Sequence, residues 1–414
     1  MAGEAQRSAV RGSGWPAWRV VVGFGMVSLA ADMVYEGGRS VYGPLLASLG
    51  GSAAMVGWVT GAGEATALVG RLVSGPLADR SRRYWALTLA GYALTAVCVP
   101  LLAITPVLGA AGLAAAIVLI LAERFGKAVR SPAKSALLAE AASQVGLGRG
   151  LGVHKALDQV GAFAGPLLVA GVIAAAAGAL GPGLAVLMVP GAASLLLLVI
   201  LRGATGDSAA PPVRVAGEDS GVRRRWVRAG LDNARLPGAF WWFSVAAGLC
   251  TAGLVTFGLI GFHLARRGVV PIAAVPVLYA VAMAAGAVAA LLTGVYYDRA
   301  GARVLLVLPL LIAAVPVFAF ARTVLPVTVG VLLWGAAVGL QDSTVKALVA
   351  DLVERARRAT AYGWFAAVQG LGALIGGVGT GVLYEHSTGA LIGAIGCTQL
   401  VALAVLLRTG PRLR

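Results

Sequence analysis

Long apolar runs separated by short polar segments account for almost the whole chain. Each run has about 20 residues or more, the length that an α-helix needs to cross the hydrocarbon core of a bilayer. The pattern therefore predicts an all-α polytopic membrane protein with twelve spanning helices, of which charged residues interrupt the fourth and the tenth. Their approximate bounds are 18–47, 53–78, 84–105, 109–141, 150–178, 183–202, 239–265, 271–297, 303–321, 326–352, 359–384 and 389–408.

The composition agrees with this prediction. Of the 414 residues, 59% are hydrophobic and 12% are charged, whereas soluble domains carry about 25% charged residues. The polar stretch at about 202–238 is too short, and too rich in Gly, Pro and Arg, to form a core. Cys98, Cys250 and Cys397 each lie inside an apolar run and form no Cys-x-x-Cys pair, so neither a disulfide framework nor a metal site is indicated.

The net charge of +16 is distributed unevenly. With the N-terminus inside, the outer loops hold only Arg266, Arg267 and Arg322 as arginines, and the other loop arginines lie on the cytoplasmic side. This asymmetry fits the positive-inside rule, so we predict a multi-pass protein of the cell membrane with both termini cytoplasmic. Because the charge is spread over short loops on one membrane face, a nucleic-acid partner is not indicated.

A polar turn occurs twice in the chain. The segment 75–83, which follows the pattern Gly-x-x-x-Asp-Arg, returns 219 residues later as 294–303. Such a repeat at about half the chain length predicts two related halves, which is typical of transporters. We therefore expect two pseudo-symmetric six-helix bundles, 1–201 and 239–414, joined by a basic cytoplasmic linker at 202–238.

A second repeat links the fifth and the eleventh runs. Gly152, Gly161, Gly165 and Pro166 recur at an offset of 211 residues as Gly363, Gly372, Gly376 and Gly377. Glycine at this periodicity lets a neighbouring helix backbone approach closely, and a proline bends the helix.

These motifs resemble those of the major facilitator superfamily. The segment 75–83 resembles the family's loop 2–3 motif, with Arg82 in place of a glycine that the second copy keeps as Gly301. The resemblance implies that Asp79 clamps the two halves together in one state and releases them in the other. The predicted cytoplasmic gate residues are Gly75, Asp79, Arg80, Arg83, Gly294, Asp298 and Arg299.

The motif in the fifth run resembles that of the proton-coupled antiporters within the superfamily. It departs from their pattern at Val169-Ala170, where a Gly-Gly pair usually closes the motif. The resemblance also implies a central cavity lined by the first, fourth, seventh and tenth helices.

Charged residues inside the predicted spans are functional candidates, because a charge at bilayer depth is costly without a partner or a water-filled cavity. The carboxyl groups suit proton uptake, since a low-dielectric cavity favours their neutral form. Alternatively, Arg39, Arg71 and Arg124 neutralise them permanently as structural ion pairs. The candidate residues of a proton and substrate cavity are Asp32, Tyr35, Glu36, Arg39, Glu64, Arg71, Glu123, Arg124, Asp158 and Asp342.

We therefore expect a monomeric secondary transporter of a small organic solute in the lipid bilayer, with protons as the coupling ion, export as the direction and no cofactor. A transporter of a metal ion or metal chelate is an alternative, because Asp32, Glu36 and Glu64 supply hard oxygen ligands. The arginines at the same depth would repel a bare cation and would equally allow an organic anion or zwitterion. A membrane-embedded enzyme or a receptor is a further alternative.

Overall fold

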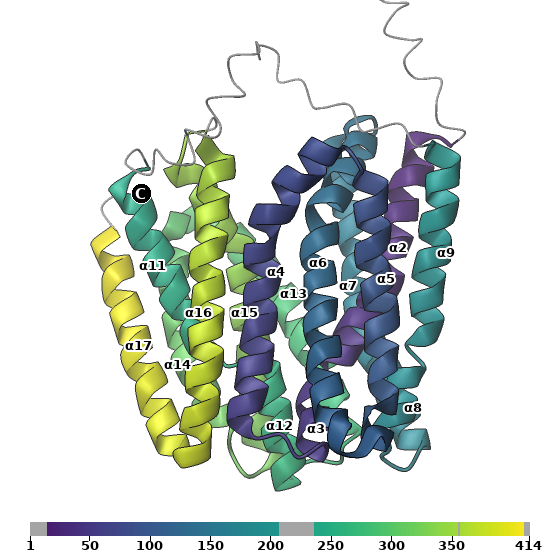
Figure 1. Cartoon of the computed structure of the whole chain (residues 1–414). Coiled ribbons are helices and arrows are strands. Elements are labelled where there is room, and N and C mark those ends of the chain that lie inside the picture. Colours follow the sequence, from purple (N-terminus) through teal and green to yellow (C-terminus); the bar gives the residue numbers. More distant parts are fainter. Residues whose placement is uncertain (1–14, 207–235, 355–356, 410–414) are drawn as a thin grey trace, which may run out of the picture.

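The computed structural model describes residues 15–206, 236–354 and 357–409, and the predicted linker lies largely outside them. Within these ranges the chain is helical and forms two bundles (Figure 1). The first bundle contains α2 (Ala17–Arg39), α3 (Tyr42–Ser48), α4 (Ala53–Ser81), α5 (Tyr84–Leu101), η1 (Leu102–Ala111), α6 (Gly112–Ser143), α7 (Leu147–Ala175), α8 (Leu180–Ala185) and α9 (Met188–Thr205). The second contains α11 (Gly238–Gly253), α12 (Phe257–Arg267), α13 (Ala274–Ala300), η3 (Gly301–Leu306), α14 (Val307–Ala319), α15 (Val324–Leu352), α16 (Arg358–His386) and α17 (Thr388–Thr409).

Ten helical stretches in the described part of the chain are long and apolar enough to cross a membrane. One of them, the 60-residue stretch Tyr84–Ser143, contains both α5 and α6, which meet at a kink where Gly109 has φ 56° and ψ −128°. Helix α4 is also long enough to span but is more polar, since it carries Glu64 and Arg71. Each predicted span therefore has a helical counterpart, and the polytopic all-α fold is confirmed.

Several spans are broken, which the apolar pattern did not predict. The first span divides at Ser40 and Val41 into α2 and α3. The seventh divides between α11 and α12, where the side chain of Thr256 accepts a hydrogen bond from the backbone N–H of Leu259 at 3.3 Å and caps α12. An N-cap of this kind compensates the unpaired amides of a new helix start. Both breaks place polar backbone near the middle of the molecule.

Glycines set the closest packing within each bundle. A Cβ added to Gly161 or Gly165 would lie 2.2 Å from the carbonyl oxygen of Leu29 or Met33, so α7 lies directly against α2. In the second bundle, Gly372 and Gly376 bring α16 equally close to α11. Gly152 has no such neighbour within 4 Å. Two of the motif glycines therefore serve close helix approach, and the third does not.

The two bundles also touch each other tightly at one end. We call the end at which α9 finishes and α11 begins the linker end, and the opposite end, with α3 and α12, the far end (Figure 1). Near the far end, a Cβ on Gly57 of α4 would lie 2.1 Å from the carbonyl oxygen of Gly377 of α16. A Cβ on Gly43 would lie 2.0 Å from the carbonyl oxygen of Gly258. The backbone N–H of Ala54 donates to Glu385 Oε1 across the same seam at 2.9 Å.

The repeated turns lie at the linker end and are open. Added Cβ atoms on Gly75 and Gly294 would meet nothing within 4 Å. Asp79 is exposed and accepts a hydrogen bond from the Tyr84 hydroxyl at 3.1 Å, within its own bundle. The side chains of Arg80, Arg83 and Arg299 are exposed as well, whereas that of Asp298 is outside the described set.

Candidate functional site

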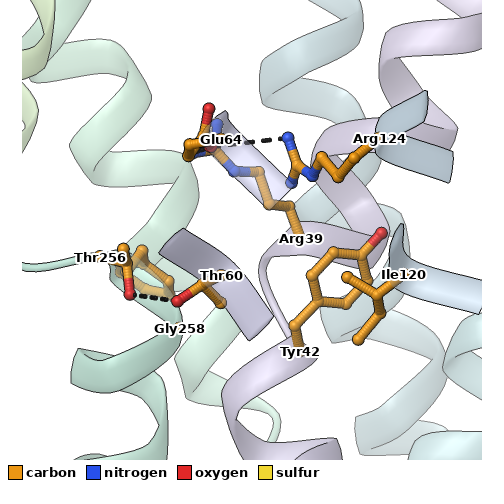
Figure 2. A pocket seen from close by; sticks show the side chains of 9 residues that line it. Arg39, Tyr42, Thr60, Glu64, Ile120, Arg124, Thr256 and Gly258 are labelled. Carbon is orange, nitrogen blue, oxygen red and sulfur yellow. Dashed lines mark hydrogen bonds and ion pairs between the residues drawn. The ribbon is translucent and has the colours of Figure 1, made fainter. Parts of the chain in front are cut away.

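Two arginines share one carboxylate at the centre of the molecule. Arg39 Nη2 lies 2.5 Å from Glu64 Oε1, and Arg124 Nη1 lies 3.5 Å from the same oxygen. The three residues come from α2, α6 and α4, and Figure 2 shows both guanidinium groups converging on Glu64. An added Cβ on Gly63 would lie 2.9 Å from Arg124 Cγ, so the glycine makes room for the arginine stem. Paired, hydrogen-bonded charges of this kind are tolerated at low dielectric where single charges are not.

Tyr35 forms the base of this cluster. Its hydroxyl accepts a hydrogen bond from Arg124 Nη1, and its ring lies under three cations. Lys127 Nζ is 3.6 Å from the ring centroid, and the guanidinium carbons of Arg124 and Arg39 are 4.6 and 5.7 Å from it. Glu123 is fully buried and lies 3.4 Å from Arg124 Nε. The Tyr35 ring and the carboxylates of Glu64 and Glu123 together stabilise several cationic side chains close to one another.

Two polar contacts join this cluster to the second bundle. The hydroxyl of Tyr279 on α13 donates to Glu36 Oε2, and Glu36 also lies 3.7 Å from Arg39 Nη1. Thr60 on α4 and Thr256 at the start of α12 are hydrogen-bonded at 2.9 Å. Because Thr60 also donates to the carbonyl of Val56, the hydrogen between the two threonines comes from Thr256. The charged cluster therefore belongs to one bundle and is bound by neutral hydroxyls of the other.

A small cavity lies at this junction, with a volume of about 10 Å³, which is room for about one water molecule. Tyr42 is 1% exposed, and its hydroxyl has no hydrogen-bond partner among the described residues. The second bundle contributes Phe257 and Thr256, whose bond to Thr60 is drawn in Figure 2. The lining residues are Arg39, Tyr42, Thr60, Glu64, Ile120, Arg124, Thr256, Phe257 and Gly258.

A separate group of titratable side chains lies between α2 and α7. The carboxyl groups of Asp32 and Asp158 are in contact, and Lys155 Nζ lies 2.6 Å from Asp158 Oδ2. Asp32 follows Leu29 by one turn and Asp158 precedes Gly161 by one turn, so the close approach at the glycine brings the two carboxyl groups together. Asp32 is therefore part of a different cluster from Glu64, although we expected a single site.

The remaining predicted cavity residues lie elsewhere. Arg71 is on α4 and half-buried, and its Nε is buried without a hydrogen-bond partner among the described residues. Asp342 is exposed on α15 and does not line the cavity. Among its described side chains the tenth span therefore contributes no lining residue, and α4, the second span, takes its place. Which helices line the cavity depends on how each helix is rotated about its axis, and the sequence alone does not give that rotation.

Neutral residues were missed by the sequence reasoning, which followed charge. Tyr42, Thr60 and Thr256 line the cavity, and Tyr279 binds Glu36. A hydroxyl or an aromatic ring inside an apolar run carries no penalty that would make it conspicuous. The break between α11 and α12 places Thr256 here, and a threonine at a helix start is a possible signal of that break.

The architecture matches a known protein family along most of the chain. A sequence profile of the Major Facilitator Superfamily matches residues 24–377 and 270–413. The chain belongs to this superfamily. An uncharacterized protein of Mycobacterium tuberculosis (strain ATCC 25618 / H37Rv) is 51% identical over 392 residues, which cover 94% of this chain and 92% of the relative. A Mycobacterium bovis protein, also uncharacterized, matches with the same values.

Solved transporters share the fold at low sequence identity. The nucleoside transporter NupG, in a mutant form, superposes with a TM-score of 0.75 and 13% identity, covering 94% of this chain and 99% of that one. A POT family transporter in complex with a thioalcohol-conjugated peptide gives 0.71 and 11% over 95% and 96% of the two chains. A bacterial homolog of the human lysosomal transporter Spinster gives 0.66 and 15% over 95% of each. These likenesses agree in fold with the family match, by which the protein is a transporter of the superfamily type embedded in a lipid bilayer.

Proposed function

We propose that the protein is a secondary active transporter that exports a small organic solute across the cell membrane by alternating access, coupled to protons. The observation that carries this proposal is the central cluster of Arg39, Glu64 and Arg124. It is held by one bundle, at a junction to which the other bundle brings the hydroxyls of Thr256 and Tyr279 and the ring of Phe257. A charged site between two bodies that can rock against each other is what carriage of a polar solute requires.

Alternating access is supported by the difference between the two ends. At the far end the bundles touch through backbone, at Gly57 against Gly377. Toward the linker end the bundles touch through side chains, as where Leu72 of α4 meets Gly363 of α16. Gly75 and Gly294 have open space there, and Asp79 is bonded inside its own bundle. If both termini are cytoplasmic, as the arginine distribution predicts, the far end is the outer side and is closed here. Asp79 would engage the second bundle when the linker end closes. We expect a monomer to suffice for this movement.

Proton coupling is supported by the Asp32–Asp158 pair. Two adjoining carboxyl groups favour sharing one proton, because both cannot be ionised at contact distance without repulsion. The charged and titratable groups that face Asp32 are Asp158 and Lys155 of α7 together with Lys127 and Lys134 of α6, and His154 lies near Asp158 and Lys134. Lys134 Nζ donates to Ser28 Oγ at 2.9 Å, beside Asp32 on α2. Protonation of Asp32 would change the charge at the α2–α7 contact that the motif glycines keep close.

Transport of a metal ion or metal chelate remains the alternative, and the geometry favours it less. Glu64 is paired with Arg39 and Arg124, and Glu123 with Arg124, so a bare cation would have to displace guanidinium groups. Within the described residues no group of three or more His, Cys, Asp or Glu side chains is placed to hold a metal ion. Calorimetric heat on adding divalent metals to the purified protein would restore this alternative.

Flux measurements in liposomes test the proposal. Solutes that raise the melting temperature of the purified protein are loaded into proteoliposomes, and their efflux is followed with and without an inwardly directed proton gradient. We expect the gradient to accelerate efflux and Asp32→Asn to abolish the acceleration. Thr251→Asn, at the equivalent position of α11, should leave it intact. Equal efflux with and without the gradient would reject coupling but not transport.

A cysteine pair tests alternating access without knowledge of the solute. Ala54→Cys and Glu385→Cys, in a background with Cys98, Cys250 and Cys397 replaced, lie across the far-end seam. Oxidation should join the bundles and stop transport, and reduction should restore it. Each single cysteine variant is the control. Transport that continues at full rate in the oxidised pair would contradict movement at this seam.

A further inference from the structure

The two walls of the central cavity are chemically different. Arg39 and Arg124 form the wall on the first bundle. On the second bundle Phe257 lines the cavity and packs edge-on against Tyr279, with ring centroids 4.6 Å apart, and it lies 5.4 Å from the ring of Trp334. Trp334 is fixed by its Nε1–H, which donates to the carbonyl of Val255 at 2.7 Å. A ligand that spans the junction would meet cations on one side and an aromatic wall on the other.

The cavity also contains a hydrogen-bond donor without a partner. Tyr42 is 1% exposed, lines the cavity, and its hydroxyl is unpaired among the described residues. A buried hydroxyl without a partner costs about 1–3 kcal/mol. A ligand that enters this cavity would supply the missing partner. Figure 2 shows the Tyr42 side chain below the two arginines.

Glu64 occupies the place that an anionic ligand would take. Its Oε1 accepts a hydrogen bond from Arg39 and forms an ion pair with Arg124 at 3.5 Å, and guanidinium groups bind carboxylates in pairs of hydrogen bonds. Resting on the transporter function proposed above, we propose that this junction is the binding site of an organic anion with an aromatic or other apolar body. The carboxylate of that anion replaces Glu64 between Arg39 and Arg124 and accepts from Tyr42, and its body packs on Phe257.

Arg71 offers Glu64 a second partner once it is displaced. Arg71 lies seven residues, or two turns, after Glu64 on the same face of α4. The rise of about 10.5 Å between them is within reach of the two long side chains. The buried Nε of Arg71 has no hydrogen-bond partner among the described residues. Each carboxylate, that of the ligand and that of Glu64, thus has a cation, so anion binding leaves no unpaired charge at this depth.

The cavity of about 10 Å³ is too small for such a solute in this conformation. The ion pairs between Glu64 and the two arginines therefore describe the empty site, in which an internal carboxylate keeps the guanidinium groups paired. We expect the site to open at the same time as the ligand carboxylate replaces Glu64 between the two arginines. A cationic solute would face Arg39 and Arg124 directly and is disfavoured.

Three probes test the proposal: benzoate, benzamide, which has nearly the same shape but no charge, and formate, which has the carboxylate but no ring. Melting temperature is titrated against each, with chloride held at equal ionic strength. We expect a saturable increase with benzoate, none with benzamide, and a weaker response to formate. Arg39→Gln should weaken benzoate binding at least tenfold, and Arg39→Lys, which keeps the charge but not the fork, by less. Arg149→Gln, an exposed arginine at the start of α7, should change nothing.

A rescue experiment tests the exchange directly. Glu64→Ala removes the internal carboxylate, so formate should raise the melting temperature of this variant more than that of the wild type. Glu140→Ala, outside the cluster, should show no such response. A benzamide response equal to that of benzoate, a benzoate response unaffected by Arg39→Gln, or the absence of any formate rescue of Glu64→Ala would each overturn the proposal. Transport of a neutral solute that does not depend on Arg39 would overturn it and leave the transporter function standing.

Discussion

At equivalent positions the two bundles use the same backbone contacts and different polar chemistry. Gly161 and Gly165 hold α7 against α2 in the first bundle, and Gly372 and Gly376 hold α16 against α11 in the second. Between these contacts the first bundle has two charged groups, Asp32 and Asp158. The two bundles therefore share their helix packing but differ in their charge.

The second bundle has Thr251 and Gln369 at the corresponding places. Thr251 accepts a hydrogen bond from Gln341 Nε2 at 2.5 Å, whereas Arg130, the counterpart of Gln341, donates to Thr95 and lies over the Tyr92 ring. The duplicated scaffold has kept its glycines while charge is concentrated in one half. Close packing is required wherever two helices must meet, but charge is needed only where a polar ligand or a proton is handled.

The largest difference between the halves should appear when one cation of the charged half is removed. Arg124→Ala leaves Glu123, which is fully buried, without its ion-pair partner, and breaking such a pair costs about 3–5 kcal/mol. Gln341→Ala removes a neutral hydrogen bond of the second bundle and should cost about 1 kcal/mol. Unfolding of the detergent-solubilised variants measures both. Equal losses of stability would mean that the buried ion pair of Arg124 contributes no more to stability than the neutral hydrogen bond of Gln341.

The shared packing should respond equally in both halves. Gly165→Val and Gly376→Val each place a branched side chain where even a Cβ would lie 2.2 or 2.1 Å from a carbonyl oxygen. Overpacking of this kind costs about 1–3 kcal/mol, so we expect similar decreases in melting temperature. Gly152→Val, with open space around it, is the control and should be nearly neutral. A large loss in one half only would contradict the equivalence of the two contacts.

Weakening the polar contact between the two bundles should reduce stability less than the changes above. Its main effect should be on conformation. Thr60→Val keeps the shape of the side chain but removes the partner of Thr256, a loss of about 0.5–1.5 kcal/mol. The far end should then open more often, so a cysteine at Ala54 should react faster with a membrane-impermeant thiol reagent. Thr66→Val is the matched control, because the Thr66 hydroxyl donates to the Ala62 carbonyl of its own helix. Unchanged reactivity would show that the Thr60–Thr256 hydrogen bond does not help to keep the far end closed.

The fold could be predicted from the sequence further than the site could. Apolar runs and the offset of 211 residues revealed the spans and the contacts of Gly161 and Gly372, because close helix approach needs glycine itself. The pairing of Arg39 with Glu64 could not be foreseen, since it depends on how α2 and α4 are rotated. Tyr42 was missed for a related reason: its hydroxyl is unusual only because of what surrounds it in three dimensions.

The smallest effect is expected where the two repeated turns differ in sequence. Arg82 ends α4 with φ 53°, in the left-handed region, and Gly301 ends α13 with φ 63°. A non-glycine residue in this region costs about 1–2 kcal/mol, of which the greater chain entropy of unfolded glycine offsets about 0.4–1 kcal/mol. With the middle of each range, Arg82→Gly should therefore stabilise the protein by about 0.8 kcal/mol. Arg83→Gly, at φ −90°, should give no gain. A decrease in melting temperature with Arg82→Gly would show that the arginine makes a contact at this turn worth more than the strain it imposes, and would make the first copy of the turn chemically distinct from the second.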